Sequence, residues 1–259
     1  MLNRHAGELD CPASYDNPPA MNAPFHLGVD PERIAINVDQ FWLLKEEGAF
    51  SGYSKAELLD GDLWGVPQQG EDVPESDAIV PIKLRVEDYE RLEQTGAFDG
   101  LGKTELVDGL VYRMSPQFRP HGFAKDELAY RLRRCLEQLS LSLWVATEQS
   151  VNLALHSEPQ PDIVLTSEPR GEGAIPGTSV ALIVEVSVTT LAFDLGKKSQ
   201  IYAAAGVPEY WVVDVNARKL HRHWQPGASG YAERSEVALG ERVTAVTLAG
   251  LGVETRGIS

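Results

Sequence analysis

The chain has 259 residues, of which 43% are hydrophobic and 24% are charged, and this composition excludes wholesale disorder. Its two cysteines are too few for a disulfide scaffold or a zinc site built from cysteines. No stretch approaches the ~18 apolar residues of a membrane helix, and the N-terminus lacks the apolar segment of a secretory signal. We therefore expect a cytoplasmic protein that does not contact membranes.

The charge is distributed unevenly along the chain. In total, 23 Lys and Arg against 38 Asp and Glu give a net charge of −15. Residues 1–112 hold 8 basic and 22 acidic residues, whereas residues 113–259 hold 15 and 16. An acidic chain disfavours phosphate binding, although the second part could still carry a local basic face. The candidates for that face, which could equally be a solvated helix surface, are Arg113, Arg119, Lys125, Arg131, Arg133 and Arg134.

An internal repeat organises the N-terminal part. Residues 34–64 align with residues 82–112 without a gap, and 12 of the 31 positions are identical. The clearest match is GAFSGYSKAELLDG against GAFDGLGKTELVDG. Each copy predicts a short amphipathic helix, then a strand, then a tight hairpin turn at Asp-Gly, where both residues tolerate positive φ.

The repeat suggests the division of the chain. We expect a disordered tail over 1–30, one helix–hairpin copy over 31–66, a polar linker over 67–79 and the main domain over 80–259. The second copy lies inside the main domain, directly before the core helix in sequence, so its hairpin is expected to join the main sheet and to direct Glu105 at the site. The first copy is expected to dock on the outside of the main domain or on another subunit, with Glu57 away from any site.

The main domain predicts helices packed against a mixed sheet, an α/β or α+β fold. Strands 180–187 and 210–215 flank a helix, which suggests a right-handed crossover between parallel strands. The predicted elements are, in chain order, a helix over 123–139, strands over 143–147, 150–155, 162–165 and 180–187, a helix over 194–206, a buried strand over 210–215 and an outer strand over 219–224.

Two carboxylates mark the predicted sheet. Asp162 opens one strand, and Glu185 interrupts the apolar run of another. A buried, unpaired carboxylate costs several kcal/mol, so something must compensate it. Two such groups on adjacent strands could share Mg²⁺ or Mn²⁺, since hard cations prefer oxygen ligands. Alternatively, Glu185 lies at a frayed strand end and faces solvent or a lysine.

A lysine follows on the next helix. Asp194, Lys198 and Tyr202 are four residues apart and so share one helix face. Lys198 could point at the two carboxylates and stabilise charge on a phosphate. The alternative is an exposed stripe of ion pairs.

These motifs resemble a known family. The stretch PDIVL…LIVEVSVTT…DLGKKSQIYAAAGVPEYWVVD looks like the Uma-two family of restriction endonucleases, in the PD-(D/E)XK nuclease superfamily. ELVDGLVYRMSP…HG resembles the N-terminal signature of that family, and LGERVTAVTLAGLGVETRGIS is similar to its C-terminal tail. The resemblance covers about 80–259 and implies a helix–three strands–helix–strand core.

The resemblance also implies site residues. Asp162 and Glu185 match the metal-binding Asp and Glu of the superfamily. Its usual lysine would fall at Ser187, and Lys198 matches the helix lysine thought to substitute for it, with Lys197 as the neighbouring alternative.

Two further positions match family residues. Glu105 is implied as a third acidic group of the site. His121 matches a family histidine that could be catalytic or could cap the start of a helix. Outside the resemblance, His221 and His223 alternate on one strand face as metal ligands might, but without a clear third ligand we expect them to face solvent.

Three functions are compatible with these patterns. The first is a Mg²⁺- or Mn²⁺-dependent endonuclease that hydrolyses DNA phosphodiester bonds, with a homodimer as a candidate assembly. The second is an inactive nuclease fold that serves as a binding or regulatory module. The third is an interaction protein that works through its acidic N-terminal repeat, which would fill the cleft as a nucleic-acid mimic.

Overall fold

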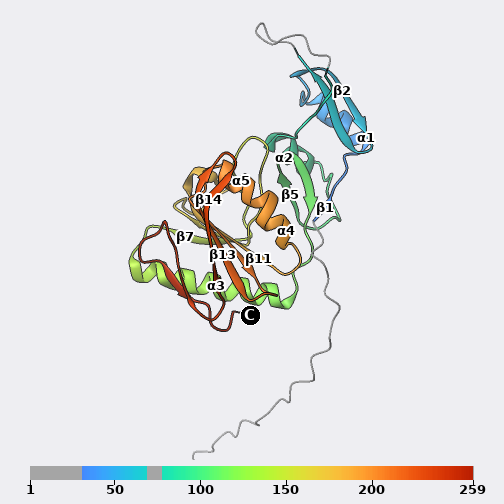
Figure 1. Cartoon of the computed structure of the whole chain (residues 1–259). Helices are drawn as coiled ribbons and strands as arrows, with labels where there is room; N and C mark the ends of the chain where they lie inside the picture. Colours follow the sequence, from blue (N-terminus) through green and yellow to red (C-terminus); the bar gives the residue numbers. More distant parts are fainter. Residues whose placement is uncertain (1–30, 69–77, 259) are drawn as a thin grey trace, which may run out of the picture.

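The computed structural model describes residues 31–68 and 78–258 (Figure 1). The predicted tail over 1–30 and most of the predicted linker over 67–79 lie outside the described residues. The described residues form a unit made of the two repeat copies, beside a larger domain built on a six-stranded sheet. Within these described ranges, no helix combines the length and the apolar character needed to cross a membrane.

Both repeat copies fold as a helix followed by a hairpin, as the sequence predicts. The turn residues have positive φ in each copy, at 49° and 82° for Asp60 and Gly61 and at 52° and 77° for Asp108 and Gly109. This is the conformation that hairpin turns of the Asp-Gly type require. The elements are α1 (Val38–Glu46), β2 (Tyr53–Leu59) and β3 (Asp62–Pro67) in copy one, and α2 (Val86–Gln94), β5 (Thr104–Val107) and β6 (Leu110–Arg113) in copy two.

Copy one packs on copy two. Short strand β1 (Glu32–Arg33), which precedes copy one, pairs with β6, and β4 (Val80–Pro81), which precedes copy two, pairs with β3. One apolar cluster spans both copies and includes Phe41 and Leu44 from α1 and Tyr89 and Leu92 from α2. Because copy two lies within residues 80–259, the expectation that copy one docks on the outside of the main domain is confirmed.

The main sheet has the strand order β14-β13-β12-β11-β9-β7. Strands β11 and β12 are parallel, as predicted, and the other neighbours are antiparallel. The expected α/β architecture is confirmed. The strands are β7 (Trp144–Thr147), β9 (Ile163–Thr166), β11 (Val180–Ser187), β12 (Glu209–Asp214), β13 (Lys219–Gly227) and β14 (Gly230–Ala238).

Only part of the strand predicted over 150–155 forms. The chain turns back at once, because Leu153 donates to the carbonyl of Ser157 at 3.1 Å. The remaining short strand β8 (Val151–Asn152) pairs in parallel with β10 (Ile175–Pro176), outside the main sheet. The following stretch is thereby left free to contact copy two.

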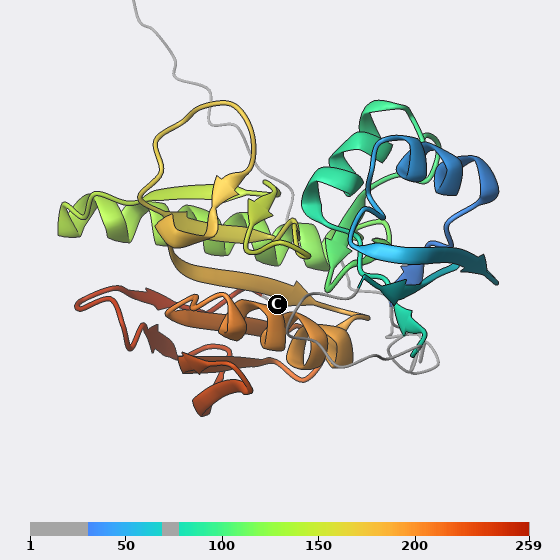
Figure 2. The ribbon, with the colours of Figure 1, turned by 90° about the horizontal axis from the view of Figure 1, so that it is seen from above.

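The two faces of the sheet are covered by different helices. On β11, Leu182, Val184 and Val186 face helix α3 (Arg119–Leu139), which begins four residues before its predicted start. Ile183 faces the other side, where Tyr202 packs. Figure 2 shows the helices on opposite sides of the sheet. The second helical segment comprises α4 (Leu191–Phe193), the π-helical η2 (Asp194–Lys198) and α5 (Ser199–Ala204), and the strand alternation places Glu185 on its side.

Glu158 joins copy two to the main domain. Its backbone N–H donates to the carbonyl of Leu106 at 2.8 Å, and its side chain is buried. Burial, together with the nearby charges of Glu90 and Glu93, raises the pKa of Glu158 to about 7. In the unfolded chain this carboxyl would ionise near its ordinary pKa of 4.5.

We predict that Glu158→Gln stabilises the protein at alkaline pH. Because the folded pKa is raised, the neutral carboxyl supports folding fully below pH ~4.5, and this contribution is lost as the pH rises through about 7. At pH ~8 the variant should melt about 2–6 °C higher than the parent by calorimetry, and the gain should vanish near pH 5. The exposed Glu137→Gln is the control. An equal gain at both pH values would contradict the assignment.

Candidate active site

The sheet brings Asp162 and Glu185 together. Strands β9 and β11 pair antiparallel with Ile163 opposite Val184, so the register places Asp162 opposite Glu185. Cross-strand neighbours of this kind point to the same face. The backbone N–H of Asp162 also lies 3.4 Å from Oε2 of Glu185.

Asp162 is held as a carboxylate by donors around it. Its Oδ2 accepts from the backbone N–H of Val186 at 2.8 Å and lies 3.0 Å from Nε2 of His121, while Nε2 of Gln117 lies 3.3 Å from Oδ1. Burial alone would raise the pKa of Asp162, but His121, the backbone N–H of Val186 and the charge of Lys103 together outweigh it, and the pKa is lowered. His121 thus contacts the site rather than only starting α3.

Glu185 is buried and hydrogen-bonded, which excludes a frayed, solvent-facing position. Its Oε1 accepts from Nζ of Lys198 at 2.9 Å and from the hydroxyl of Tyr202 at 2.7 Å. Burial raises the pKa of Glu185 to about 8, although Lys198 opposes the shift. The two facing carboxyls therefore differ in their affinity for protons.

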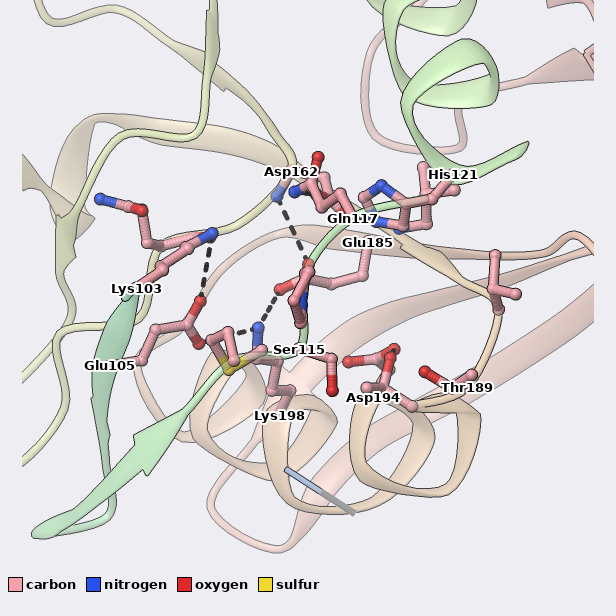
Figure 3. Close-up of a pocket in the computed structure, with 16 residues that line it drawn as sticks. Lys103, Glu105, Ser115, Gln117, His121, Asp162, Glu185, Thr189, Asp194 and Lys198 are labelled. Carbon is pink, nitrogen blue, oxygen red and sulfur yellow. Dashed lines mark hydrogen bonds and ion pairs between the residues drawn. The ribbon is translucent and has the colours of Figure 1, made fainter. Parts of the chain in front are cut away.

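Lys198 lies between two acidic residues. Its side chain is 1% exposed, and Nζ lies 2.9 Å from Oε1 of Glu185 and 3.0 Å from Oε2 of Glu105 (Figure 3). Burial works against its charge, but the carboxylates of Glu105 and Glu185 outweigh this and raise the pKa of Lys198 well above its ordinary value. Lys197 points elsewhere and donates to the hydroxyl of Tyr112 at 2.7 Å.

Glu105 reaches the site from copy two. The β5–β6 hairpin does not join the main sheet, contrary to expectation; it forms a three-stranded sheet with β1 and touches the core through the Leu106–Glu158 bridge. Glu105 is nevertheless fully buried beside Lys198, and Lys103 lies 3.5 Å from its other oxygen. Neither carboxylate oxygen of Glu105 has a geometrically good hydrogen bond among the described residues.

Sequence reasoning missed a chain of contacts behind Asp162. Nζ of Lys125 donates to Oε1 of Gln117 at 2.9 Å and lies 2.8 Å from the carboxylate of Glu148. The signal was the spacing of His121 and Lys125, one helical turn apart on α3. Lys125 is therefore buried and is not part of an exposed basic face.

The two β13 histidines were expected to face solvent, and the structure contradicts this expectation. His223 packs against the rings of Tyr210 and Tyr231, which also contact each other, and burial lowers the pKa of His223 to about 4. Nδ1 of His221 lies 3.3 Å from Glu236. Both Nε2 atoms are buried without a hydrogen-bond partner in the described chain.

A cleft opens beside these groups, with a volume of about 70 Å³. This is enough for several water molecules. All its lining residues fall between Lys103 and Lys198, so no described residue of copy one fills it. Among residues 31–68 and 78–258, no three His, Cys, Asp or Glu side chains are already arranged to hold a metal ion.

Comparison with known proteins agrees with this fold. A family model described as "Putative restriction endonuclease", Uma2, matches residues 86–256. One similar solved structure is a putative nuclease belonging to DUF820 from Anabaena variabilis, with a TM-score of 0.52 and 13% identity over 68% of this chain and 97% of that one. No curated protein sequence matches the chain. Because the family model spans most of the chain, including every element around the cleft from α2 to β16 (Gly252–Glu254), the protein belongs to the Uma2 family of putative restriction endonucleases.

Proposed function

We propose that the protein is a metal-dependent endonuclease that hydrolyses DNA phosphodiester bonds, acting in the cytoplasm. The observation that carries the proposal is the convergence of Asp162, Glu185 and Lys198 in one cleft, supplied by two strands and a helix. Burial of three ionisable groups is costly, and such clusters gather at functional sites.

The donor set fits a hard divalent cation such as Mg²⁺ or Mn²⁺. Asp162 and Glu185 would hold it, and Glu105 offers two oxygens without good hydrogen bonds. Because these side chains are not already arranged as ligands, their carboxylates would have to reorient. When bound, such an ion polarises a phosphate and lowers the pKa of a water molecule.

The protein side chains then have separate roles. Asp162, whose pKa is lowered, stays ionised and available as a ligand. Lys198 stays protonated, so it acts as a fixed positive charge near the phosphate rather than as a base. Lys103 lines the same cleft and is partly exposed, which suits a contact to the DNA backbone.

One observation favours a second candidate function, an inactive binding or regulatory module. Nζ of Lys198 already contacts oxygens of both Glu105 and Glu185, so this ammonium competes with a metal ion for the same oxygens. Ser187 also stands where the superfamily usually has its lysine. The third hypothesis, a repeat that occludes the cleft, finds no contact in its favour among the described residues.

We predict that metal binding depends on Asp162. Titration calorimetry with Mn²⁺ should show binding to the parent protein and none to Asp162→Ala or the isosteric Asp162→Asn, since both lose the ligand charge. The exposed Glu233→Gln should bind like the parent. Unchanged Mn²⁺ binding by both Asp162 variants would overturn the metal assignment.

We predict that replacing Lys198 reduces the rate of DNA cleavage, whereas replacing Lys197 does not. Lys198→Met should reduce Mg²⁺-dependent plasmid cleavage ~100-fold or more, because it removes the fixed charge beside the phosphate. It should also lower the melting temperature, since Glu105 and Glu185 then share a buried site without their cation. Lys197→Met, which loses only the Tyr112 contact, should cleave at nearly the parental rate. A dead Lys197→Met beside an active Lys198→Met would refute the role given to Lys198.

A further inference from the structure

The two repeat copies exchange strands reciprocally. In one contact Arg33 pairs with Tyr112, and in the other Pro81 pairs with Trp64. The two contacts are equivalent, because Pro81 is 48 residues after Arg33 and Tyr112 is 48 residues after Trp64, the offset of the repeat. The strand that precedes each copy therefore pairs with the second hairpin strand of the other copy, which is the pattern of an approximate twofold axis.

The backbone hydrogen bonds obey the same symmetry. Ile34 donates to Val111 at 2.8 Å, and Ile82 donates to Leu63 at 2.8 Å. Both bonds run between the copies, and the offset of 48 residues converts one into the other. Individual backbone hydrogen bonds between the copies therefore also follow the approximate twofold symmetry.

The side chains follow it as well. The rings of Phe41 and Phe50 stack in copy one with their centroids 5.2 Å apart, and those of Tyr89 and Phe98 stack in copy two at 5.6 Å. Figure 2 shows α1 and α2 side by side, in agreement with their contacts. The equivalent Leu44 and Leu92 are 1% and 0% exposed in the shared cluster. This is an apolar, isologous contact of the kind that holds obligate dimers.

Copy one is an addition to the part of the chain that matches the family. That match begins at residue 86, inside copy two, and 97% of the Anabaena chain is matched by 68% of this one. Without copy one, the face of copy two that carries Tyr89 and Leu92 would be an exposed apolar surface. A second copy of the same face would cover it, because the contact is twofold.

We propose that copy one occupies a homodimerisation surface of copy two and takes the place of a second subunit. The intact chain is then a monomer, in contrast to the homodimer considered from the sequence. A second chain could pair only where copy one is displaced.

This stand-in subunit lacks a catalytic core. Val86 and Val107 of copy two are 7% and 0% exposed, whereas the equivalent Val38 and Leu59 of copy one are 60% and 51% exposed. At these two positions a buried residue of copy two has an exposed counterpart in copy one. A symmetric dimer would hold two clefts lined by Asp162, Glu185 and Lys198, but the described residues of this chain form one such cleft. Resting on the proposed function, we infer that the protein nicks one DNA strand per encounter.

The pairing is tested by sedimentation of full-length variants. The parent chain should be a monomer. Leu44→Asp places a charge in the shared cluster, should release copy one, and should give a reversible monomer–dimer equilibrium as copy two pairs with copy two of another chain. The double variant Leu44→Asp/Leu92→Asp spoils both faces and should be a monomer.

Three outcomes would overturn the pairing: a dimeric parent, a Leu44→Asp variant that stays monomeric or forms only larger aggregates, or a dimeric double variant. Leu44→Ala covers the case in which the aspartate variant does not fold, since it should shift the same equilibrium in part. A folded Leu44→Ala that remains monomeric at high concentration would count against the proposal.

The single cleft is tested on supercoiled plasmid with Mg²⁺. Open circles should accumulate before linear DNA appears, and direct conversion to linear DNA would refute the single-site inference. Absence of any cleavage would contradict the proposed function, whereas the pairing is decided by sedimentation alone.

Discussion

The ammonium group of Lys198 is the contact on which the rest of the site depends. It is 1% exposed and reaches two carboxylates at 2.9 and 3.0 Å, Glu185 in the main sheet and Glu105 in the hairpin of copy two. Breaking such a buried pair leaves a charge without compensation and costs ~3–5 kcal/mol. The same interaction that prepares the site therefore fastens the N-terminal unit to the sheet, so that the position of copy two and the geometry of the cleft cannot vary independently.

The strand register places two carboxyl groups side by side, and their surroundings shift their pKa values in opposite directions. Asp162 receives the backbone N–H of Val186 and the ring of His121, and its pKa is lowered; Glu185 has more burial than compensation, and its pKa is raised to about 8. Two acids with opposed shifts can serve different tasks at one pH. The pKa of Glu185 stays raised although Lys198 lies 2.9 Å away, so a bound metal ion would supply the further positive charge that favours its ionisation and would link cation binding to proton release.

Much of this could be predicted from local pattern. The apolar run around Glu185 predicted a buried strand, and the Asp-Gly pairs predicted both hairpins, because each of these signals depends on a few adjacent residues. The family resemblance implied Glu105 as a site residue, whereas no local sequence pattern could predict its contact with Lys198. The sequence left open whether copy one docks on the main domain or on another subunit, since Leu44 needs burial whatever covers it. The π-helical turn at Asp194–Lys198 has no sequence spacing of its own, whereas the spacing of His121 and Lys125 on one face of α3 was a signal that the sequence reasoning overlooked.

The outer face of copy one shows how a repeat adapts when no core covers it. Leu110 of copy two packs beside Phe193 of the main domain, and the equivalent position in copy one is Asp62, which forms an ion pair with Arg33. A charged residue thus stands in copy one where copy two makes an apolar contact with the main domain. Leu59 remains exposed but lies on the same hairpin as this ion pair, and small patches broken by charge stay soluble. Copy one thus keeps the helix–hairpin of copy two, while a charged residue stands in place of one of the apolar residues that would contact a second core.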